Sequence, residues 1–119
     1  MYKFYNANAL GNKVNDCVVR AISLAEDKTW DETYKELSEI AQSQGILLDD
    51  VEFVEGYLDN RYKRQCHYSK TVGEFIDEFP VGVYLITMEG HITVVIDGTL
   101  FDTFDCRDSR MWCSWKVSD

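Results

Sequence analysis

The hydrophobic period of this chain changes at Pro80, its only proline. Upstream of it, apolar residues recur at the spacing expected for amphipathic helices. Downstream, the runs VYLITM, HITVVI, TLFDTF and WCSWKV are rich in β-branched and aromatic residues and are separated by turn signals. Helices and strands in separate blocks predict an α+β domain in which N-terminal helices pack on a C-terminal antiparallel sheet.

The first predicted helix runs from Asp16 to Glu26. Either Asn15 or Asp16 could cap its start. Its apolar positions follow the spacing of one helix face and are Val18, Ala21, Ile22 and Ala25. Cys17 is therefore expected in the first turn of this helix.

Three further helices are expected before the proline. The sequence TWDE, which begins at Thr29, is a capping box, and Gly45 is the stop of the helix that it opens. Another helix should begin near Asp49, and a short one near Thr71. The stripe of the capped helix that should face the core is Trp30, Tyr34, Leu37 and Ala41.

The Asp97-Gly98 pair predicts a β-hairpin, because a type I′ turn needs positive φ at both central residues. With a two-residue turn, His91 and Asp102 become diagonal neighbours on one face of the hairpin. A carboxylate in that position orients an imidazole and stabilises its charged form. If the turn takes three residues, the pairing shifts by one and Asp105 lies opposite His91 instead.

The predicted place of Cys17 favours a thiolate, since a helix amino terminus offers partial positive charge and free backbone N–H groups. The second ring nitrogen of His91 would be free to meet that thiol. The same place supplies an oxyanion hole in many thiol hydrolases, made of the nucleophile's own amide and a side-chain amide from just upstream. Asn12 and Asn15 are both candidates for the second donor.

Other residues have alternative interpretations. Arg20 lies one helical turn beyond Cys17 and could hold the thiolate or a substrate carboxylate, but a salt bridge to one of the many acidic residues is the simpler interpretation. Cys66-His67 is a rival dyad, although neighbours in a sequence seldom point at each other. Trp112 and Trp115 should point to opposite faces of the last strand, so that one is buried and the other can line a cleft.

The charge of the chain limits its partners. Twelve basic and 21 acidic residues give a formal net charge of −9, which repels phosphate backbones and anionic membrane surfaces. We therefore expect no nucleic-acid and no membrane partner. The N-terminal sequence lacks the apolar segment of a secretory signal, so we expect a cytoplasmic protein.

The expected location also predicts the oxidation state of the cysteines. A cytoplasmic location predicts free thiols for Cys17, Cys66, Cys106 and Cys113. No two of them form a C-x-x-C pair, so we expect neither a metal site nor a cofactor.

The order of these motifs resembles a known family. A cysteine that opens the first helix, a histidine that opens a strand far downstream and an aspartate after the next turn look like the papain-like cysteine peptidase superfamily. NDCVVRAIS together with GHITVVIDGTLFDTFD is similar, more closely, to small phage-encoded proteins related to the peptidases that trim double-glycine leaders from bacteriocins. The resemblance implies a single papain-like domain over residues 1–119.

The resemblance also implies a role for each residue. Cys17 would be the nucleophile of a catalytic triad, His91 the general base and acid, and Asp102 the residue that orients it, with Asp105 as the alternative. Many papain-like enzymes place a glutamine where this chain has Gly11, so the choice between the two asparagines stays open.

The predicted function is that of a phage cysteine peptidase, a thiol protease or amide or isopeptide hydrolase acting on a peptide or protein substrate. The alternative is an inactive papain-like binding module that grips a host or phage protein. Acyl transfer to an amine would use the same site as hydrolysis. The substrate, its cleavage site and the oligomeric state stay open at this point.

Overall fold

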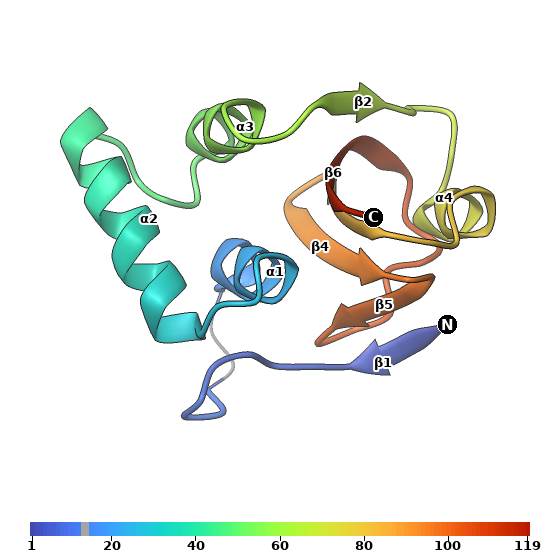
Figure 1. The fold of residues 1–119 in the computed structure, drawn as a ribbon, viewed down its shortest axis with the longest axis horizontal. Coiled ribbons are helices and arrows are strands. Elements are labelled where there is room, and N and C mark those ends of the chain that lie inside the picture. Colours follow the sequence, from blue (N-terminus) through green and yellow to red (C-terminus); the bar gives the residue numbers. More distant parts are fainter. Residues whose placement is uncertain (13–14) are drawn as a thin grey trace.

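The computed structural model describes residues 1–12 and 15–119 and shows an α+β architecture. Within these residues, four helices accompany a six-stranded mixed sheet of order β1-β5-β4-β3-β6-β2 (Figure 1). The helices are α1 (Cys17–Ala25), α2 (Trp30–Gln44), α3 (Val51–Asp59) and α4 (Val72–Glu78). The strands are β1 (Tyr2–Phe4), β2 (Arg64–Cys66), β3 (Val83–Met88), β4 (His91–Ile96), β5 (Thr99–Asp102) and β6 (Met111–Ser118).

The predicted hairpin at Asp97-Gly98 is confirmed. Ile96 pairs with Thr99, so the β4–β5 turn has two residues. Asp97 and Gly98 have φ values of 47° and 80°, the left-handed conformation that a type I′ turn requires. The register that brings Asp102 close to His91 is therefore the observed one.

Two short strands were not predicted. β1 pairs with β5 in parallel, and β2 pairs with β6 antiparallel at the other edge of the sheet. The expectation of a purely antiparallel sheet was therefore wrong, because the parallel pairing comes from a segment ahead of all the helices. Each strand has three residues, which is too short for a period-2 pattern to stand out in the sequence.

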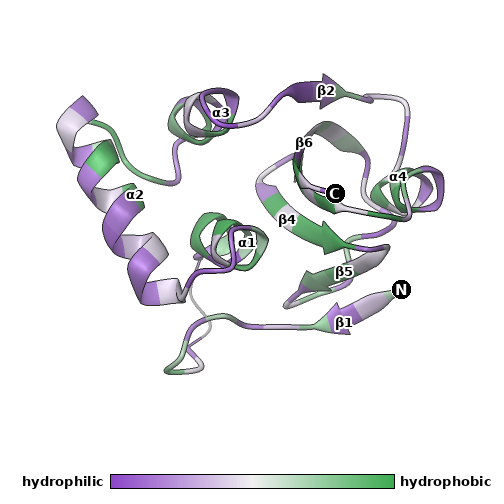
Figure 2. Ribbon diagram, viewed as in Figure 1, coloured by the Kyte–Doolittle hydropathy of each residue, from purple (hydrophilic) through white to green (hydrophobic). Residues whose placement is uncertain are grey.

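The two faces of the sheet are covered by different helices. α1, α2 and α3 enclose one core with Leu85, Val94 and Trp115, whereas α4 packs on the opposite face against Ile86 and Val95. Neighbouring residues of one strand thus enter different cores, as the pleat requires. Figure 2 shows α1 and β4 as largely hydrophobic ribbons facing each other, which fits helix α1 lying directly on the central strand.

The helix ends are largely as predicted. Thr29 and Thr71 form capping boxes at α2 and α4, and Gly45 ends α2 in the left-handed conformation with φ 68°. The predicted core stripe of α2 was wrong at one position. Tyr34 is 48% exposed and Thr33 is buried in its place, while Leu37 and Ala41 are buried as predicted.

The cysteines also require a correction. Cys66 and Cys113 face each other across the β2–β6 pair and form a disulfide, which leaves Cys17 and Cys106 as free thiols. The expectation of four free thiols was wrong because β2 was not recognised, and its pairing with β6 is what brings the two cysteines together.

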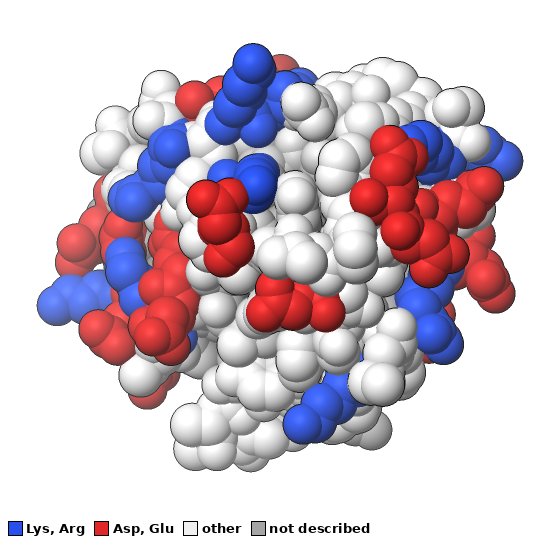
Figure 3. Space-filling view, turned by 45° about the vertical axis from the view of Figure 1, so that its right-hand side comes forward, with Lys and Arg blue, Asp and Glu red and all other residues white. Residues whose placement is uncertain are grey.

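The surface carries mixed charges. On the face drawn in Figure 3, Asp and Glu side chains gather mainly toward both sides, with Lys and Arg among them, and the surface between is largely uncharged with a few acidic side chains. Within residues 1–12 and 15–119, no helix is both long and apolar enough to cross a membrane.

Candidate functional site

Cys17 is the first residue of α1, as predicted from the sequence. Its half-buried side chain lines one cavity together with His91 and Ile92, both on β4. The packing of α1 on β4 is therefore what brings the helix start to the strand start. Burial alone would raise the pKa of the Cys17 thiol, but the contacts with His91 and Ile92 and the nearby Arg20 charge outweigh it and lower that pKa.

His91 is the first residue of β4, directly after the two-residue turn that contains Gly90. Its Nε2 lies 2.7 Å from Oδ2 of Asp102, and its ring is packed beside Phe104. Since Nε2 is engaged by the carboxylate, Nδ1 is the ring nitrogen left for the thiol. The imidazole therefore lies between an acid and a thiol.

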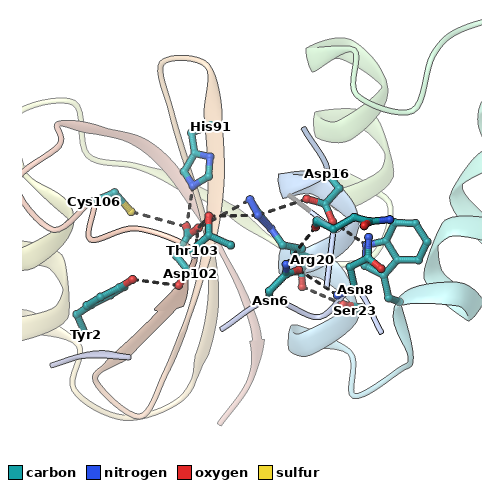
Figure 4. A network of polar contacts seen from close by, with 12 residues as sticks. Tyr2, Asn6, Asn8, Asp16, Arg20, Ser23, His91, Asp102, Thr103 and Cys106 are labelled. Carbon is teal, nitrogen blue, oxygen red and sulfur yellow. Dashed lines mark hydrogen bonds and ion pairs between the residues drawn. The ribbon is translucent and has the colours of Figure 1, made fainter. Parts of the chain in front are cut away.

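Asp102 ends β5 and is almost fully buried, with its side chain 3% exposed. Backbone contacts fix its position: its carbonyl accepts from the N–H of Tyr5 at 2.9 Å, and its Oδ1 accepts from the N–H of Thr103 at 2.7 Å. The unpredicted strand β1 therefore helps to hold Asp102 in place. Figure 4 shows the carboxylate between His91 on one side and Arg20 on the other.

Asp105, the alternative partner for His91, lies elsewhere. Its carboxylate is exposed and pairs with Arg107, with Oδ1 2.9 Å from Nε and Oδ2 2.8 Å from Nη2. The structure thus brings together Cys17, His91 and Asp102 and leaves Asp105 outside the group.

The charges of the three groups stabilise one another. Burial lowers the pKa of His91, but hydrogen bonds to Asp102, Cys106 and Cys17 more than offset it and raise this pKa to about 11. Burial likewise raises the pKa of Asp102, but the bond to His91 outweighs it and lowers that pKa. The lowered pKa values of Cys17 and Asp102 and the raised pKa of His91 thus favour the charged form of each group.

Arg20 makes the salt bridges that the sequence suggested. It lies 3.3 Å from Oδ1 of Asp16 and 3.8 Å from Oδ1 of Asp102. Asp16 occupies the N-cap position of α1, and its Oδ2 accepts from Nε1 of Trp30 at 2.8 Å. A buried polar chain therefore runs from the start of α2 through α1 to the end of β5.

Two cavities meet beside His91, because Met88, His91 and Trp112 line both of them. The smaller, of about 250 Å³, also contains Cys17 and the aliphatic side chains of Val51 and Val54. The larger, of about 580 Å³, is more polar and is lined by Tyr68, Glu89, Phe104, Ser109 and Arg110. A ligand can therefore reach the thiol and extend past the imidazole.

As predicted, one of the two tryptophans is buried and the other lines a cavity. Trp115 is fully buried in the core between the sheet and the first three helices, and Trp112 lines both cavities. Trp112 thus forms part of the wall of the candidate cleft.

The oxyanion candidates differ in position. Asn15 lines the smaller cavity together with Cys17. Both asparagines are exposed, and the backbone carbonyl of Asn12 accepts from the Asn6 side chain at 3.2 Å. Of the two candidates, Asn15 is therefore the one that lies at the cavity of Cys17.

Cys106 was missed as a site neighbour. Its buried sulfur lies 4.0 Å from Oδ2 of Asp102. One possible metal-ligating atom from each of His91, Asp102 and Cys106 lies within 4.8 Å of the others. A nitrogen, an oxygen and a sulfur are a donor set that zinc accepts. His91 and Asp102 are already joined by a direct hydrogen bond, so we assign the cluster to the network around Asp102. The sequence held no signal for it, because Cys106 follows β5 in an irregular loop.

The rival dyad does not form. Cys66 is bonded to Cys113, and His67 packs against the aromatic rings of Phe75 and Phe79. Burial lowers the pKa of His67, as expected for a neutral ring among apolar neighbours.

Comparisons of this chain with protein-family models, with curated proteins and with solved structures found no match.

Proposed function

We propose that this protein is a papain-like cysteine hydrolase that cleaves an amide or isopeptide bond of a peptide or protein substrate. The observation that carries the proposal is that Cys17 and His91 line one cavity while the buried Asp102 bonds to the far side of the His91 ring. The lowered pKa of the thiol and the raised pKa of the imidazole support it, because the first favours the nucleophilic thiolate and the second keeps the ring protonated as an acid.

The first half of the reaction uses the ion pair. The Cys17 thiolate attacks the substrate carbonyl carbon, a C–S bond forms, and the carbonyl electron pair moves to the oxygen. In this proposal the backbone amide of Cys17 and the side chain of Asn15, which line the same cavity, stabilise that oxygen. When the intermediate collapses, the C–N bond breaks and the leaving nitrogen takes the proton of His91.

The second half restores the site. His91, now neutral, takes a proton from a water molecule while the water oxygen attacks the thioester. Collapse breaks the C–S bond and releases the acid, which leaves a thiolate and an imidazolium again. Asp102 keeps the ring oriented and stabilises its charge through both steps. An amine in place of water would make the protein an acyl transferase with the same residues.

Two further parts of the proposal rest on the sequence resemblance. These are a phage origin and action in the cytoplasm of a bacterial host, where the bridge between the exposed Cys66 and the buried Cys113 would meet reducing conditions. The net charge of −9 supports a peptide or protein substrate over a nucleic acid.

The test is covalent capture. Intact-mass analysis should detect one adduct with an electrophilic peptide probe that carries a small residue before its warhead, and Cys17→Ala should abolish it. A thiol that reacts no faster with iodoacetamide than a free cysteine would favour the inactive binding module instead.

A further inference from the structure

Arg20 is a largely buried cation between two buried carboxylates. Its side chain is 12% exposed, and the partners Asp16 and Asp102 are 6% and 3% exposed. Its Nη1 also lies 3.4 Å from Oγ1 of Thr103. A charge so placed costs folding energy unless it is paired, so each of these contacts matters.

These contacts join the two elements that carry the site. Arg20 lies on α1, one turn after Cys17, while Asp102 and Thr103 lie at the end of β5. On the α1 side, Asp16 is itself anchored to α2 through Trp30. Figure 4 shows the guanidinium bridging the two carboxylates between the helix and the strand.

The contacts also divide the two oxygens of Asp102. Oδ1 accepts from the Thr103 N–H and faces Arg20, whereas Oδ2 faces His91. A carboxylate that was free to rotate could present either oxygen, at different angles, to the imidazole. The Thr103 hydrogen bond and the Arg20 ion pair at 3.8 Å both act on Oδ1, which leaves Oδ2 as the oxygen directed at His91.

We propose that Arg20 is a positioning residue: by clamping Asp16 of α1 to Asp102 of β5, it sets both the distance between Cys17 and His91 and the direction of the Asp102 carboxylate. The inference rests on the proposed function, because it assigns a role within that same site. A planar guanidinium can reach two carboxylates at once, whereas a lysine ammonium on a flexible stem can satisfy only one of them well.

The test is the pH profile of Cys17 alkylation by iodoacetamide, read at Cys17 by peptide mass mapping. Arg20→Gln should raise the apparent pKa of the thiol by about one unit, which is about a tenfold loss of rate at a pH below that pKa. Arg20→Lys should restore part of this loss. Asp16→Asn, which removes the charge that holds Arg20 on the helix side, should shift the profile in the same direction by less.

Arg61→Gln is the matched control. Arg61 also joins two acidic residues, Glu26 and Glu36, but lies away from the cleft, so the profile should stay that of the wild type. Circular dichroism verifies the folding of each variant. If Arg20→Gln does not fold, Arg20→Lys and Asp16→Asn decide the question, and wild-type profiles in both would overturn the inference.

The two proposals fail differently. A wild-type Cys17 with an ordinary thiol profile would remove the proposed hydrolase, whatever Arg20 does. A low thiol pKa in the wild type that stays unchanged in folded Arg20→Gln would remove only the role of Arg20.

Discussion

At the residue scale, the reactivity of the site depends on the protonation states of Cys17, His91 and Asp102. The His91 imidazole lies between the Asp102 carboxylate and the Cys17 thiol, and both neighbours favour its charged form. The thiol is half-buried, so its charge is worth more here than it would be in water. Replacing Asp102 should therefore change the reactivity of the Cys17 thiol, although the two side chains are separated by the imidazole.

The first prediction separates the two aspartates. Asp102→Asn should reduce alkylation of Cys17 by roughly 10- to 100-fold, because the amide no longer stabilises the imidazolium and favours the wrong ring tautomer. Asp105→Asn is the control and should have little effect, since Asp105 pairs with Arg107 on the surface. Iodoacetamide kinetics on folded variants measures both, and a larger loss for Asp105→Asn would contradict the assignment.

The second prediction concerns pH. The ring of His91 should titrate near pH 11, far above an ordinary histidine, and that of His67 below 6.5. Because the pKa of His91 is raised in the folded state, its contribution to stability is complete below about pH 6.5 and is lost as the pH rises through about 11. NMR of the two histidine rings reports both values, and His67 serves as an internal control. A His91 ring that titrates near 6.5 would show that the ion pair does not form.

At the scale of elements, the strong local signals in the sequence were reliable. The capping boxes at Thr29 and Thr71 and the Asp97-Gly98 turn are local, and each is found where it was predicted. β1 and β2 were missed because short strands are defined by their partners, which lie far away in the sequence. The pairing of His91 with Asp102 could be predicted because the turn sets the register, but the clamp of Arg20 could not, because it crosses from a helix to a strand.

The third prediction tests the hairpin turn. Gly98 has φ 80°, and an added Cβ would meet the Pro80 carbonyl at 3.4 Å, so Gly98→Ala should lower the free energy of unfolding by about 1 kcal/mol. Gly56→Ala is a control with the opposite expected sign. Gly56 lies inside α3 with open space around its Cβ position, so alanine there should raise that free energy by about 0.5 to 1 kcal/mol. Urea denaturation measures both, and a neutral Gly98→Ala would show that the turn tolerates another conformation.

At the scale of the whole molecule, the site is assembled from three separate parts of the chain. The helical block supplies Cys17 and Arg20, the hairpin supplies His91 and Asp102, and strand β1 fixes the backbone of Asp102. The β2–β6 pair forms part of the cleft wall. Trp112 of β6 lines both cavities, and its neighbour Cys113 is bonded to Cys66 of β2. Loss of packing between the blocks should therefore abolish the reactivity of Cys17.

The last prediction uses the four cysteines as reporters of that arrangement. In the folded, non-reduced protein, iodoacetamide should label Cys17 alone, because Cys106 is buried and Cys66 and Cys113 are bonded. Denaturation without a reductant should expose Cys106 as well, and only reduction should free the remaining pair. Cys17→Ala should remove the labelling of the folded protein and leave the other two steps unchanged. Intact mass after each step gives the count of labels. Four labels on denatured protein that was purified without reductant would rule out the bridge, and rapid labelling of Cys106 in the folded protein would show that the end of β5 opens to solvent.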